Sequence, residues 1–319
     1  MRYVTFSTTT NPTRRVGVLV PLGSAPGAHT HVVDLSAAFE ADGGAPLTGG
    51  MRGLLASLDT ALPRTRTAAS SGQYRTEFSA ATLHAPISDP EKIICVGMNY
   101  FDHCAEIGVA VPKEPVLFSK FASSITGPGC PIPLDEELVK ELDFEVELCI
   151  VIGKKGRHIR PEEALDHIAG WTVAHDVSAR DLQLKRNGGQ WLLGKTGDGH
   201  APIGPSIVTR DEGPAFSDAC ALDCKCFVNG TRMQSSNTRE LIFKPIDILV
   251  YASSYFTLNP GDLIFTGTPG GVGVFRKPPL FLKDGDECVV EIDGLGSLTN
   301  TVRATKGGNG SPAAKRAKL

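Results

Sequence analysis

Acidic and apolar residues alternate along residues 141–148, which read Glu-Leu-Asp-Phe-Glu-Val-Glu-Leu. The apolar run Cys-Ile-Val-Ile follows at 149–152. A period of two is typical of a β-strand, whose side chains point alternately to its two faces. The pattern therefore predicts one strand with Asp143, Glu145 and Glu147 on the same face.

Carboxylates that share a buried face repel one another, so a positive charge is expected among them. A hard divalent cation is the simplest partner, and Asp176, which follows a second apolar strand at 171–174, could supply another oxygen ligand. Oxygen ligands favour Mg²⁺, Mn²⁺ or Ca²⁺ over Zn²⁺. The alternative is an edge strand whose acidic face meets water.

Residues 178–181, Ser-Ala-Arg-Asp, match a capping box and predict that a helix begins where the second strand ends. Arg180 and Gln183 would then lie three residues apart on one side of that helix, close to the cation. An arginine and a glutamine in that position suit a substrate carboxylate.

The remaining pattern predicts short strands joined by loops, and the 35 glycines and 22 prolines favour a β-rich protein over a helical bundle. Helical spacing is weak at 54–62 and clearer at 240–255, whereas 64–73 has no periodicity and is predicted to be a mobile connector. Strands are expected at 16–20, 32–35, 93–97, 116–119 and 263–265, with hairpins at 224–233 and 285–302. Residues 1–88 are predicted to form a separate small domain.

The net charge of −3 argues against nucleic-acid binding, and no apolar run is long enough to span a membrane. Because the N-terminus also lacks the apolar core of a secretory signal, we expect a soluble intracellular protein. The eight cysteines are scattered, and the three at 220, 224 and 226 lack a fourth partner at zinc-finger spacing. They are predicted to be reduced thiols, with a zinc site as the alternative.

His103 and Glu106 are spaced i, i+3, so on a short helix they could form a hydrogen-bonded pair. A glutamate held against an imidazole raises its basicity, as a general base for water requires; the alternative is an ordinary surface pair. The Gly-rich stretch after 263–265 could bind an anionic oxygen through its amides and the Thr268 hydroxyl.

Residues 189–196 formally match a nucleotide-binding Walker A motif. A phosphate-binding loop must follow a buried strand and open a helix, but here a basic turn precedes the motif and Gly-Asp-Gly-His-Ala-Pro follows it. We therefore reject an ATP site. Lys195 stays a candidate functional residue in another role.

Four ordered motifs resemble the fumarylacetoacetate hydrolase family, over roughly residues 90–303. Further runs resemble one branch of that family: Pro112–Pro115, Phe118–Ile125, Gln190–Thr196 and Gly273–Pro279. The four motifs are Cys-Val-Gly-Met-Asn-Tyr-x-Asp-His-x-x-Glu at 95–106, Glu-x-Glu at 145–147, Asp-Val-Ser-Ala-Arg-Asp-x-Gln at 176–183, and Thr-Gly-Thr-Pro-x-Gly-Val-Gly at 266–273.

The resemblance implies an α+β fold, a predominantly β mixed-sheet β-roll with a smaller N-terminal domain, and a homodimer. Residues 89–303 would form the metal-dependent catalytic domain. The site residues that it implies are Glu145, Glu147 and Asp176 for Mg²⁺ or Mn²⁺, His103, Glu106 and Lys195 for catalysis, and Arg180, Gln183 and Thr268 for the substrate. Two departures bear on the substrate: Met98 stands where many relatives carry arginine, and the loop at 197–201 differs.

Three carboxylates around a divalent ion leave about three of six octahedral positions open. A 2-oxo acid could fill two of them, and Lys195 and Arg180 would balance its negative charge. With water activated by His103 and Glu106, the expected reaction is carbon–carbon hydrolysis of an acylpyruvate-like 2,4-dioxo acid through a metal-bound enolate. The alternatives are an oxaloacetate decarboxylase or keto–enol tautomerase, and a metal-binding scaffold without turnover.

Residues 304–319 are rich in Gly, Pro, Ala and basic residues and predict a disordered targeting tail. It ends in Ala317-Lys318-Leu319, a close variant of the peroxisomal Ser-Lys-Leu signal. This predicts binding to a peroxisomal targeting receptor and location in a peroxisome or glycosome. The alternatives are a basic nuclear signal, or the cytoplasm.

Overall fold

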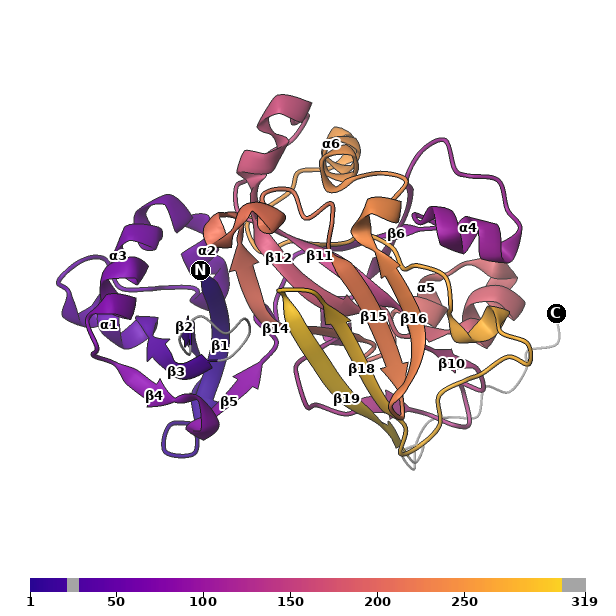
Figure 1. Ribbon diagram of the computed structural model, residues 1–319, viewed down its shortest axis with the longest axis horizontal. Coiled ribbons are helices and arrows are strands. Elements are labelled where there is room, and N and C mark those ends of the chain that lie inside the picture. Colours follow the sequence, from indigo (N-terminus) through magenta and orange to yellow (C-terminus); the bar gives the residue numbers. More distant parts are fainter. Residues whose placement is uncertain (22–28, 306–319) are drawn as a thin grey trace, which may run out of the picture.

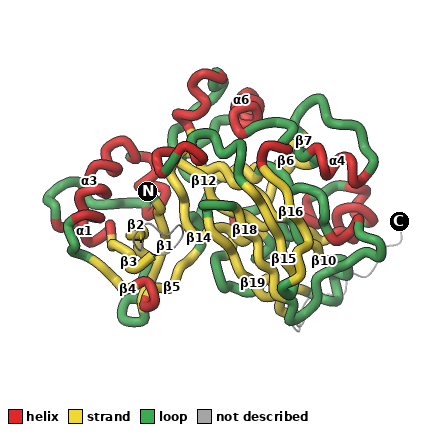
Figure 2. The backbone as a smooth tube through the Cα atoms, in the orientation of Figure 1, coloured by secondary structure: helices red, strands yellow, loops and turns green. Residues whose placement is uncertain are grey.

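The computed structural model of this protein describes residues 1–21 and 29–305. Figure 1 shows the N-terminal strands and helices on one side and a larger β-rich body on the other. Figure 2 shows that strands dominate this larger body, with short helices at its edges. The architecture is a mixed-sheet α+β fold, as the family resemblance implies.

The largest sheet has twelve strands, and ten of them follow the order β4-β3-β2-β1-β14-β12-β11-β17-β6-β7, while β5 pairs with β1 and β8 with β14. Its strands are β1 (Arg2–Thr8), β2 (Arg15–Pro21), β3 (His29–Asp34), β4 (Arg75–Glu77), β5 (Ala81–His84), β6 (Ile93–Gly97), β7 (Val116–Lys120), β8 (Ile125–Thr126), β11 (Val146–Ile152), β12 (Ile168–His175), β14 (Ala201–Thr209) and β17 (Leu263–Phe265). The predicted strands at 16–20, 93–97, 116–119 and 263–265 are thereby confirmed, and β3 covers most of the one at 32–35.

A second sheet of five strands has the order β16-β15-β18-β19-β9. It packs against β11 and β12 through a large apolar core, which includes the fully buried Trp171, Phe144 and Leu298. Its strands are β9 (Ile132–Leu134), β15 (Asp223–Val228), β16 (Thr231–Asn237), β18 (Glu287–Ile292) and β19 (Gly296–Ala304). Both predicted hairpins are confirmed, and Asn229 and Gly230 have the positive φ values, 49° and 74°, that a type I′ turn needs.

The helices are short and lie around the sheets (Figure 1). They are α1 (Leu35–Ala41), α2 (Gly50–Ala56), α3 (Leu58–Ser70), α4 (Phe101–Ile107), α5 (Leu192–Lys195) and α6 (Pro245–Tyr255). Helix α6 confirms the helix predicted at 240–255 from Pro245 onward, whereas residues 241–244 are not helical. No helix of the described residues is long and apolar enough to cross a membrane, and all eight cysteines are free.

The N-terminal strands extend the largest sheet, because β1 pairs antiparallel with β14, Tyr3 opposite Ile207. The boundary at residue 88 stays a prediction. The mobile connector predicted at 64–73 is wrong, since α3 continues to Ser70. Arg64 holds this helix against α1, since its guanidinium lies 3.9 Å from the Phe39 ring centroid and 2.6 Å from a carboxylate oxygen of Asp42, which follows α1.

The single acidic strand predicted from residue 141 onward is interrupted. Leu142 and Asp143 form β10, which pairs with β13 (Ser178–Ala179), and β11 begins only at Val146. Between them, side chains take the backbone donors: Asp143 accepts from the Phe144 N–H (2.8 Å) and Gln234 accepts from the Val146 N–H (2.9 Å). As a result Asp143 is not aligned with the two glutamates as a third member of one regular strand face.

The capping box predicted at 178–181 is also wrong. Ser178 lies in β13, and a π-helical turn, η4 (Asp181–Lys185), begins without a side-chain cap. The Ser178 hydroxyl instead donates to the Asp176 carbonyl oxygen (2.9 Å) and accepts from Lys195 (2.6 Å). The serine therefore supports the candidate site, not a helix start.

Candidate active site

Glu145, Glu147 and Asp176 come together at one end of the paired strands β11 and β12. Glu147 lies opposite Ala174, and Asp176 follows the last residue of β12. A carboxylate oxygen from each of the three lies within 4.8 Å of the others, and among the described residues this is the group able to hold a metal. All three are at least 95% buried, so the alternative of a solvent-exposed acidic edge does not apply.

Three buried cations accompany these carboxylates. Lys195 Nζ donates to Glu145 (2.9 Å) and to one oxygen of Asp176 (2.7 Å), while Lys120 Nζ donates to the other Asp176 oxygen (2.6 Å). Arg180 donates through Nε to Asp143 (2.8 Å) and through Nη2 to Glu145 (2.5 Å). Asp143 therefore serves as the anchor of Arg180, and its second role is to accept the Gly273 and Val274 amide hydrogens.

The sequence predicts Lys195 but not Lys120, because nothing local marks that lysine at the end of β7 as buried. Lys195 reaches the carboxylates from α5, which lies tightly on η4. A Cβ on Gly194 would approach Gln183 Cβ to 2.6 Å and Ala179 O to 2.8 Å, so only glycine allows this close approach.

Charge at the site does not balance within the chain itself. Burial and the neighbouring Asp176 and Glu145 carboxylates raise the pKa of Glu147 well above its usual value. Glu145 behaves in the opposite way: burial raises its pKa, but Arg180 and Lys195 outweigh burial and lower it to about 2. The carboxylates are Asp143, Glu145, Glu147 and Asp176, and the cations are Lys120, Arg180 and Lys195, which leaves one excess negative charge.

The unbalanced group is Glu147. Within the described residues it has a backbone donor, the Gly267 N–H at 2.7 Å, and no ion pair. A buried carboxylate without a cation is costly, and a divalent cation with oxygen ligands would remove that cost. The donor set, its burial and its excess negative charge therefore fit the Mg²⁺ or Mn²⁺ that the family resemblance implies.

The His–Glu pair lies on α4, as its spacing predicts. His103 Nδ1 is 3.1 Å from Glu106 Oε2, and the other carboxylate oxygen of Glu106 accepts from the Gly271 N–H (2.9 Å). Burial raises the pKa of Glu106, but these hydrogen bonds outweigh burial, and the net shift is downward. An ionised Glu106 is therefore in place to hold the His103 ring and support a proton on it.

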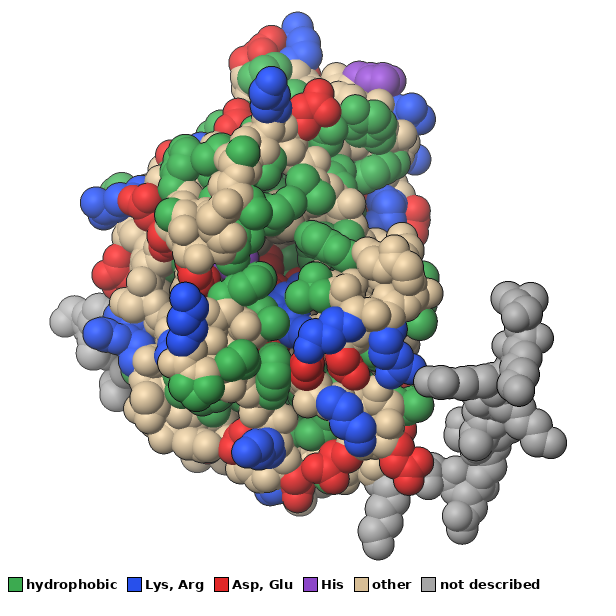
Figure 3. Space-filling view, turned by 90° about the vertical axis from the view of Figure 1, so that its right-hand side faces the viewer, with side chains coloured by type: hydrophobic (Ala, Val, Ile, Leu, Met, Phe, Trp, Pro, Cys, Tyr) green, Lys and Arg blue, Asp and Glu red, His purple; other side chains and the backbone are tan. Residues whose placement is uncertain are grey.

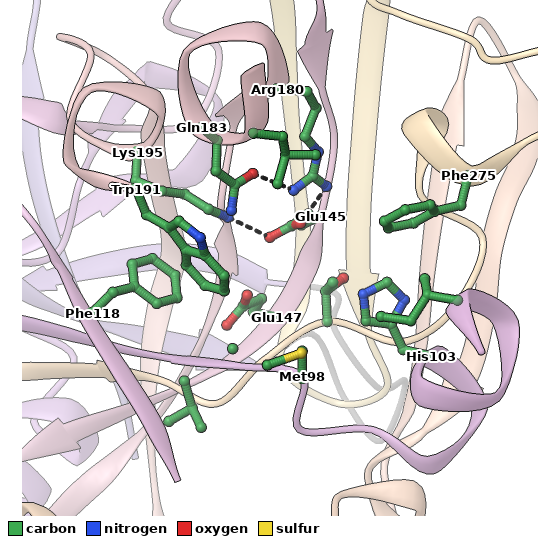
Figure 4. A pocket seen from close by; sticks show the side chains of 15 residues that line it. Met98, His103, Phe118, Glu145, Glu147, Arg180, Gln183, Trp191, Lys195 and Phe275 are labelled. Carbon is green, nitrogen blue, oxygen red and sulfur yellow. Dashed lines mark hydrogen bonds and ion pairs between the residues drawn. The ribbon is translucent and has the colours of Figure 1, made fainter. Parts of the chain in front are cut away.

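His103, Glu145 and Glu147 line one cavity of about 140 Å³, and Asp176 lies behind its lining. Figure 4 shows His103 across from Glu145, with Arg180, Gln183 and Lys195 above and Met98 below. The face of the molecule that carries α4 is seen in Figure 3, where hydrophobic side chains surround a hollow with charged groups inside it. The lining residues include Glu145, Glu147, Arg180, Gln183, Lys195, Thr268, His103, Met98, Phe118, Trp191 and Phe275.

The predicted substrate residues differ in what they can offer. Arg180 Nη1 donates to Gln183 Oε1 (2.9 Å), which leaves the Gln183 amide hydrogens for a ligand. Thr268 lines the cavity, but its hydroxyl donates to Val146 O (3.0 Å) and accepts from Gln234 Nε2 (2.8 Å). Its proton is thus already used, and its role as an anion donor stays a prediction. Gln234 escaped the sequence analysis because it lies in an unremarkable hairpin strand.

A β-roll that brings a buried carboxylate triad, buried cations and a His–Glu pair to one cavity defines the class of fumarylacetoacetate hydrolase-like enzymes. The chain belongs to this family: residues 92–303 match the family described as Fumarylacetoacetate (FAA) hydrolase C-terminal. The resemblance drawn from the four motifs is thereby confirmed.

Individual proteins agree with this assignment. The chain is 50% identical, over 95% of its length and 90% of the relative's, to the Xenopus laevis protein named oxaloacetate tautomerase fahd2, mitochondrial. The fumarylacetoacetate hydrolase from Exiguobacterium antarcticum has a TM-score of 0.77 at 35% identity, covering 96% of this chain and 100% of that one. A maleylpyruvate hydrolase from Sphingobium sp. SYK-6, solved with manganese(II) and pyruvate, has a TM-score of 0.75 at 29% identity, with the same coverage.

These comparisons refine one expectation and correct another. The chain is an enzyme of this family, and the branch suggested by the additional runs, fumarylacetoacetate hydrolase domain-containing protein 2, is confirmed by the Xenopus laevis relative. The peroxisomal or glycosomal location is contradicted, because the Xenopus laevis, human and bovine relatives are named as mitochondrial. The Ala317-Lys318-Leu319 tail on which that prediction rested lies outside the described residues.

Proposed function

We propose that this protein is a divalent-metal-dependent tautomerase that interconverts the keto and enol forms of oxaloacetate. The observation that carries the proposal is a single general base, His103 held by Glu106, which lines the same small cavity as Glu145 and Glu147 of the buried carboxylate triad. The name of the Xenopus laevis relative, 50% identical over nearly the whole chain, supports the same reaction. Hydrolysis, the first expectation from the sequence, thus becomes the second candidate.

Glu145, Glu147 and Asp176 would hold the Mg²⁺ or Mn²⁺. When bound, the cation supplies a Lewis acid that favours negative charge on the 2-oxo oxygen of the substrate. The buried Lys195 and Arg180 add positive charge beside that position, and Gln183 offers neutral amide hydrogens to a carboxylate.

His103 performs the proton transfer. In the direction from keto to enol, the C3–H bond breaks, the imidazole takes the proton, and the electron pair forms the C2–C3 double bond. The proton then passes to the C2 oxygen, so no water is consumed and no carbon–carbon bond is broken. Glu106, whose pKa is lowered, stabilises the imidazolium while it carries the proton.

Hydrolysis of an acylpyruvate-like 2,4-dioxo acid is the second candidate, because the same pair could activate a water. The likeness to a maleylpyruvate hydrolase solved with manganese(II) and pyruvate supports it. That likeness is at 29% identity, whereas the tautomerase relative is 50% identical, so the tautomerase is favoured. Oxaloacetate decarboxylation and a scaffold role without turnover remain the competing outcomes of the test.

The test follows enol oxaloacetate by its ultraviolet absorbance with Mg²⁺, Mn²⁺ or a chelator, and measures pyruvate in the same samples. A tautomerase speeds the loss of the enol only with metal and releases no pyruvate above the background. Pyruvate formed in step with substrate loss would instead indicate decarboxylation. Cleavage of acylpyruvates without enol conversion would indicate the hydrolase, and no reaction on any substrate would refute both.

Mitochondrial names among the relatives support a mitochondrial location for this chain as well. A reporter fused to the full chain, imaged with a mitochondrial marker, tests that location. The homodimer implied by the family stays a prediction, which light scattering of the purified protein would check.

A further inference from the structure

An aromatic wall lines one side of the cavity. We define it as Trp191 and Phe118 together with the Gly97 backbone beneath them. The two rings meet edge to face, with centroids 5.3 Å apart and an interplanar angle of 68°. Figure 4 shows both rings on the side of the cavity opposite His103 and Phe275.

Gly97 allows the Trp191 ring to lie directly on strand β6. A Cβ at this position would be 2.8 Å from Trp191 Cζ3 and 2.9 Å from Cη2, shorter than real Cβ contacts. A larger residue would push the ring away from the strand. The position of the ring is therefore set by its contacts with Phe118 and with the bare backbone at Gly97.

The aromatic wall begins where the charged end of the substrate is expected to bind. The Phe118 ring centroid is 5.0 Å from Lys195 Nζ, and that ammonium group pairs with Glu145 and Asp176. A 2-oxo acid whose polar end lies at these groups must direct its remaining carbons into the space between Trp191 and the His103 side. Because the cavity holds about 140 Å³, on the order of ten water molecules, that space is small.

We propose that Trp191 is a specificity-determining residue that admits 2-oxo acids with a small group beyond C3 and excludes those with a bulky one. The inference deepens the proposed function and rests on it for the position of the polar end. In this inference one side chain, that of Trp191, limits the site to substrates about as small as oxaloacetate. Trp191→Ala removes the ring and opens the aromatic wall, whereas Gly97→Ala displaces the ring and leaves its volume in place.

Calorimetric titration of the full-length protein in Mg²⁺ tests the proposal with two probes, pyruvate and the branched 4,4-dimethyl-2-oxopentanoate, whose tert-butyl group is larger than the second carboxylate of oxaloacetate. The wild type is expected to bind pyruvate more tightly. In Trp191→Ala the ratio of the two affinities should shift toward the branched acid by at least about tenfold, since a few methylene groups in a pocket carry discrimination of that size. Gly97→Ala, which keeps the Trp191 ring, should not shift the ratio of affinities toward the branched acid.

Leu193→Ala is the matched control, because Leu193 lies on the short helix α5, which begins directly after Trp191, but is 53% exposed and outside the cavity. It should leave the ratio unchanged. A ratio in Trp191→Ala equal to that of the wild type, whether all affinities stay or all fall together, overturns the proposal. The milder Trp191→Phe, expected to give an intermediate ratio, guards against a folding defect in the alanine variant.

Fluorescence provides a second readout that requires no turnover. The chain has two tryptophans, and the other, Trp171, is fully buried and donates to the Phe216 carbonyl. A change in emission on adding pyruvate with Mg²⁺ should thus come from Trp191 and disappear in Trp191→Phe. If it persists, Trp191 does not contact the ligand.

Failure of this inference and failure of the proposed function are distinguishable. Binding ratios test the aromatic wall, whereas enol conversion tests the tautomerase. A shifted ratio without enol conversion would leave the specificity role intact and assign the site to another reaction of 2-oxo acids. Enol conversion with an unchanged ratio of the two affinities would refute only the specificity role of Trp191.

Discussion

Replacing Glu147 with glutamine is expected to stabilise the metal-free protein and to abolish its response to Mn²⁺. Glu147 is the carboxylate left without an ion pair in a cluster of four carboxylates and three cations. Glutamine has nearly the same shape and can still accept the Gly267 N–H. The substitution therefore removes the unbalanced charge, and with it a ligand, while the backbone contact stays.

The size of the effect follows from proton linkage. Burial, then Asp176 and Glu145, raise the pKa of Glu147 in the folded protein, whereas in the unfolded chain it is near 4.3. Between the two values the folded state keeps a proton that the unfolded state has lost. The free energy of unfolding of the metal-free wild type therefore falls by up to about 1.4 kcal/mol per pH unit as the pH rises.

Glu147→Gln does not titrate, so its advantage over the metal-free wild type should vanish near pH 4 and grow as the pH rises, to no more than about 4 kcal/mol at pH 7. Because a change of 1 kcal/mol in the free energy of unfolding shifts Tm by about 2–4 °C, the difference is measurable as a shift in Tm. Adding Mn²⁺ at one hundred times its Kd should stabilise the wild type by about 2.7 kcal/mol and leave the variant unchanged.

Thermal unfolding at several pH values, with a chelator or with Mn²⁺, measures these shifts. Glu287→Gln is a suitable control, because Glu287 is exposed on β18 and should change neither the pH dependence nor the response to Mn²⁺. The reasoning is refuted if metal-free Glu147→Gln is less stable than the wild type at pH 7, or if Mn²⁺ stabilises both proteins equally.

Three further substitutions test the neighbouring groups. His103→Ala should lower kcat for enol conversion about 10²–10⁴-fold and leave Mn²⁺ affinity unchanged in calorimetry; full activity would make the His103–Glu106 pair structural. Lys195→Met should lower the free energy of unfolding of the metal-free protein by about 3–5 kcal/mol, because Glu145 and Asp176 lose their shared cation. With Mn²⁺ bound the loss should be clearly smaller. An equal loss in both conditions would contradict the role of Lys195 as the cation that these carboxylates share. Lys120→Met frees one oxygen of Asp176 and removes a buried positive charge beside it, so it should strengthen Mn²⁺ binding without altering the preference between pyruvate and the branched acid; a changed preference would show that its effect reaches the aromatic wall.

Sequence patterns predict the parts of this site that depend on spacing. The alternation of Glu145 and Glu147 places both side chains on one face, and Asp176 joins them because it follows the neighbouring strand. The i, i+3 spacing of His103 and Glu106 likewise gives the observed hydrogen bond. In each case a short period or one strand pairing determines the contact.

Features that depend on distant side chains were not predictable in this way. The acidic strand breaks at Phe144 because Gln234, 88 positions further along the chain, takes the Val146 N–H. Lys120 is a buried partner of Asp176 across 56 positions, and its own segment looks like an ordinary strand end. The place of Trp191 in the aromatic wall depends on Gly97, which lies beneath its ring, and neither local sequence indicates that contact.

Metal-dependent enol conversion at the carboxylate triad can be followed in a single sample. Enol oxaloacetate is mixed with the purified full-length protein, and its ultraviolet absorbance is followed first in a chelator and then after excess Mg²⁺ is added. Our account predicts decay at the uncatalysed rate in the chelator and a rapid, catalytic decay once Mg²⁺ is present. Equal catalysis in the chelator, or no catalysis after Mg²⁺ is added, would contradict it.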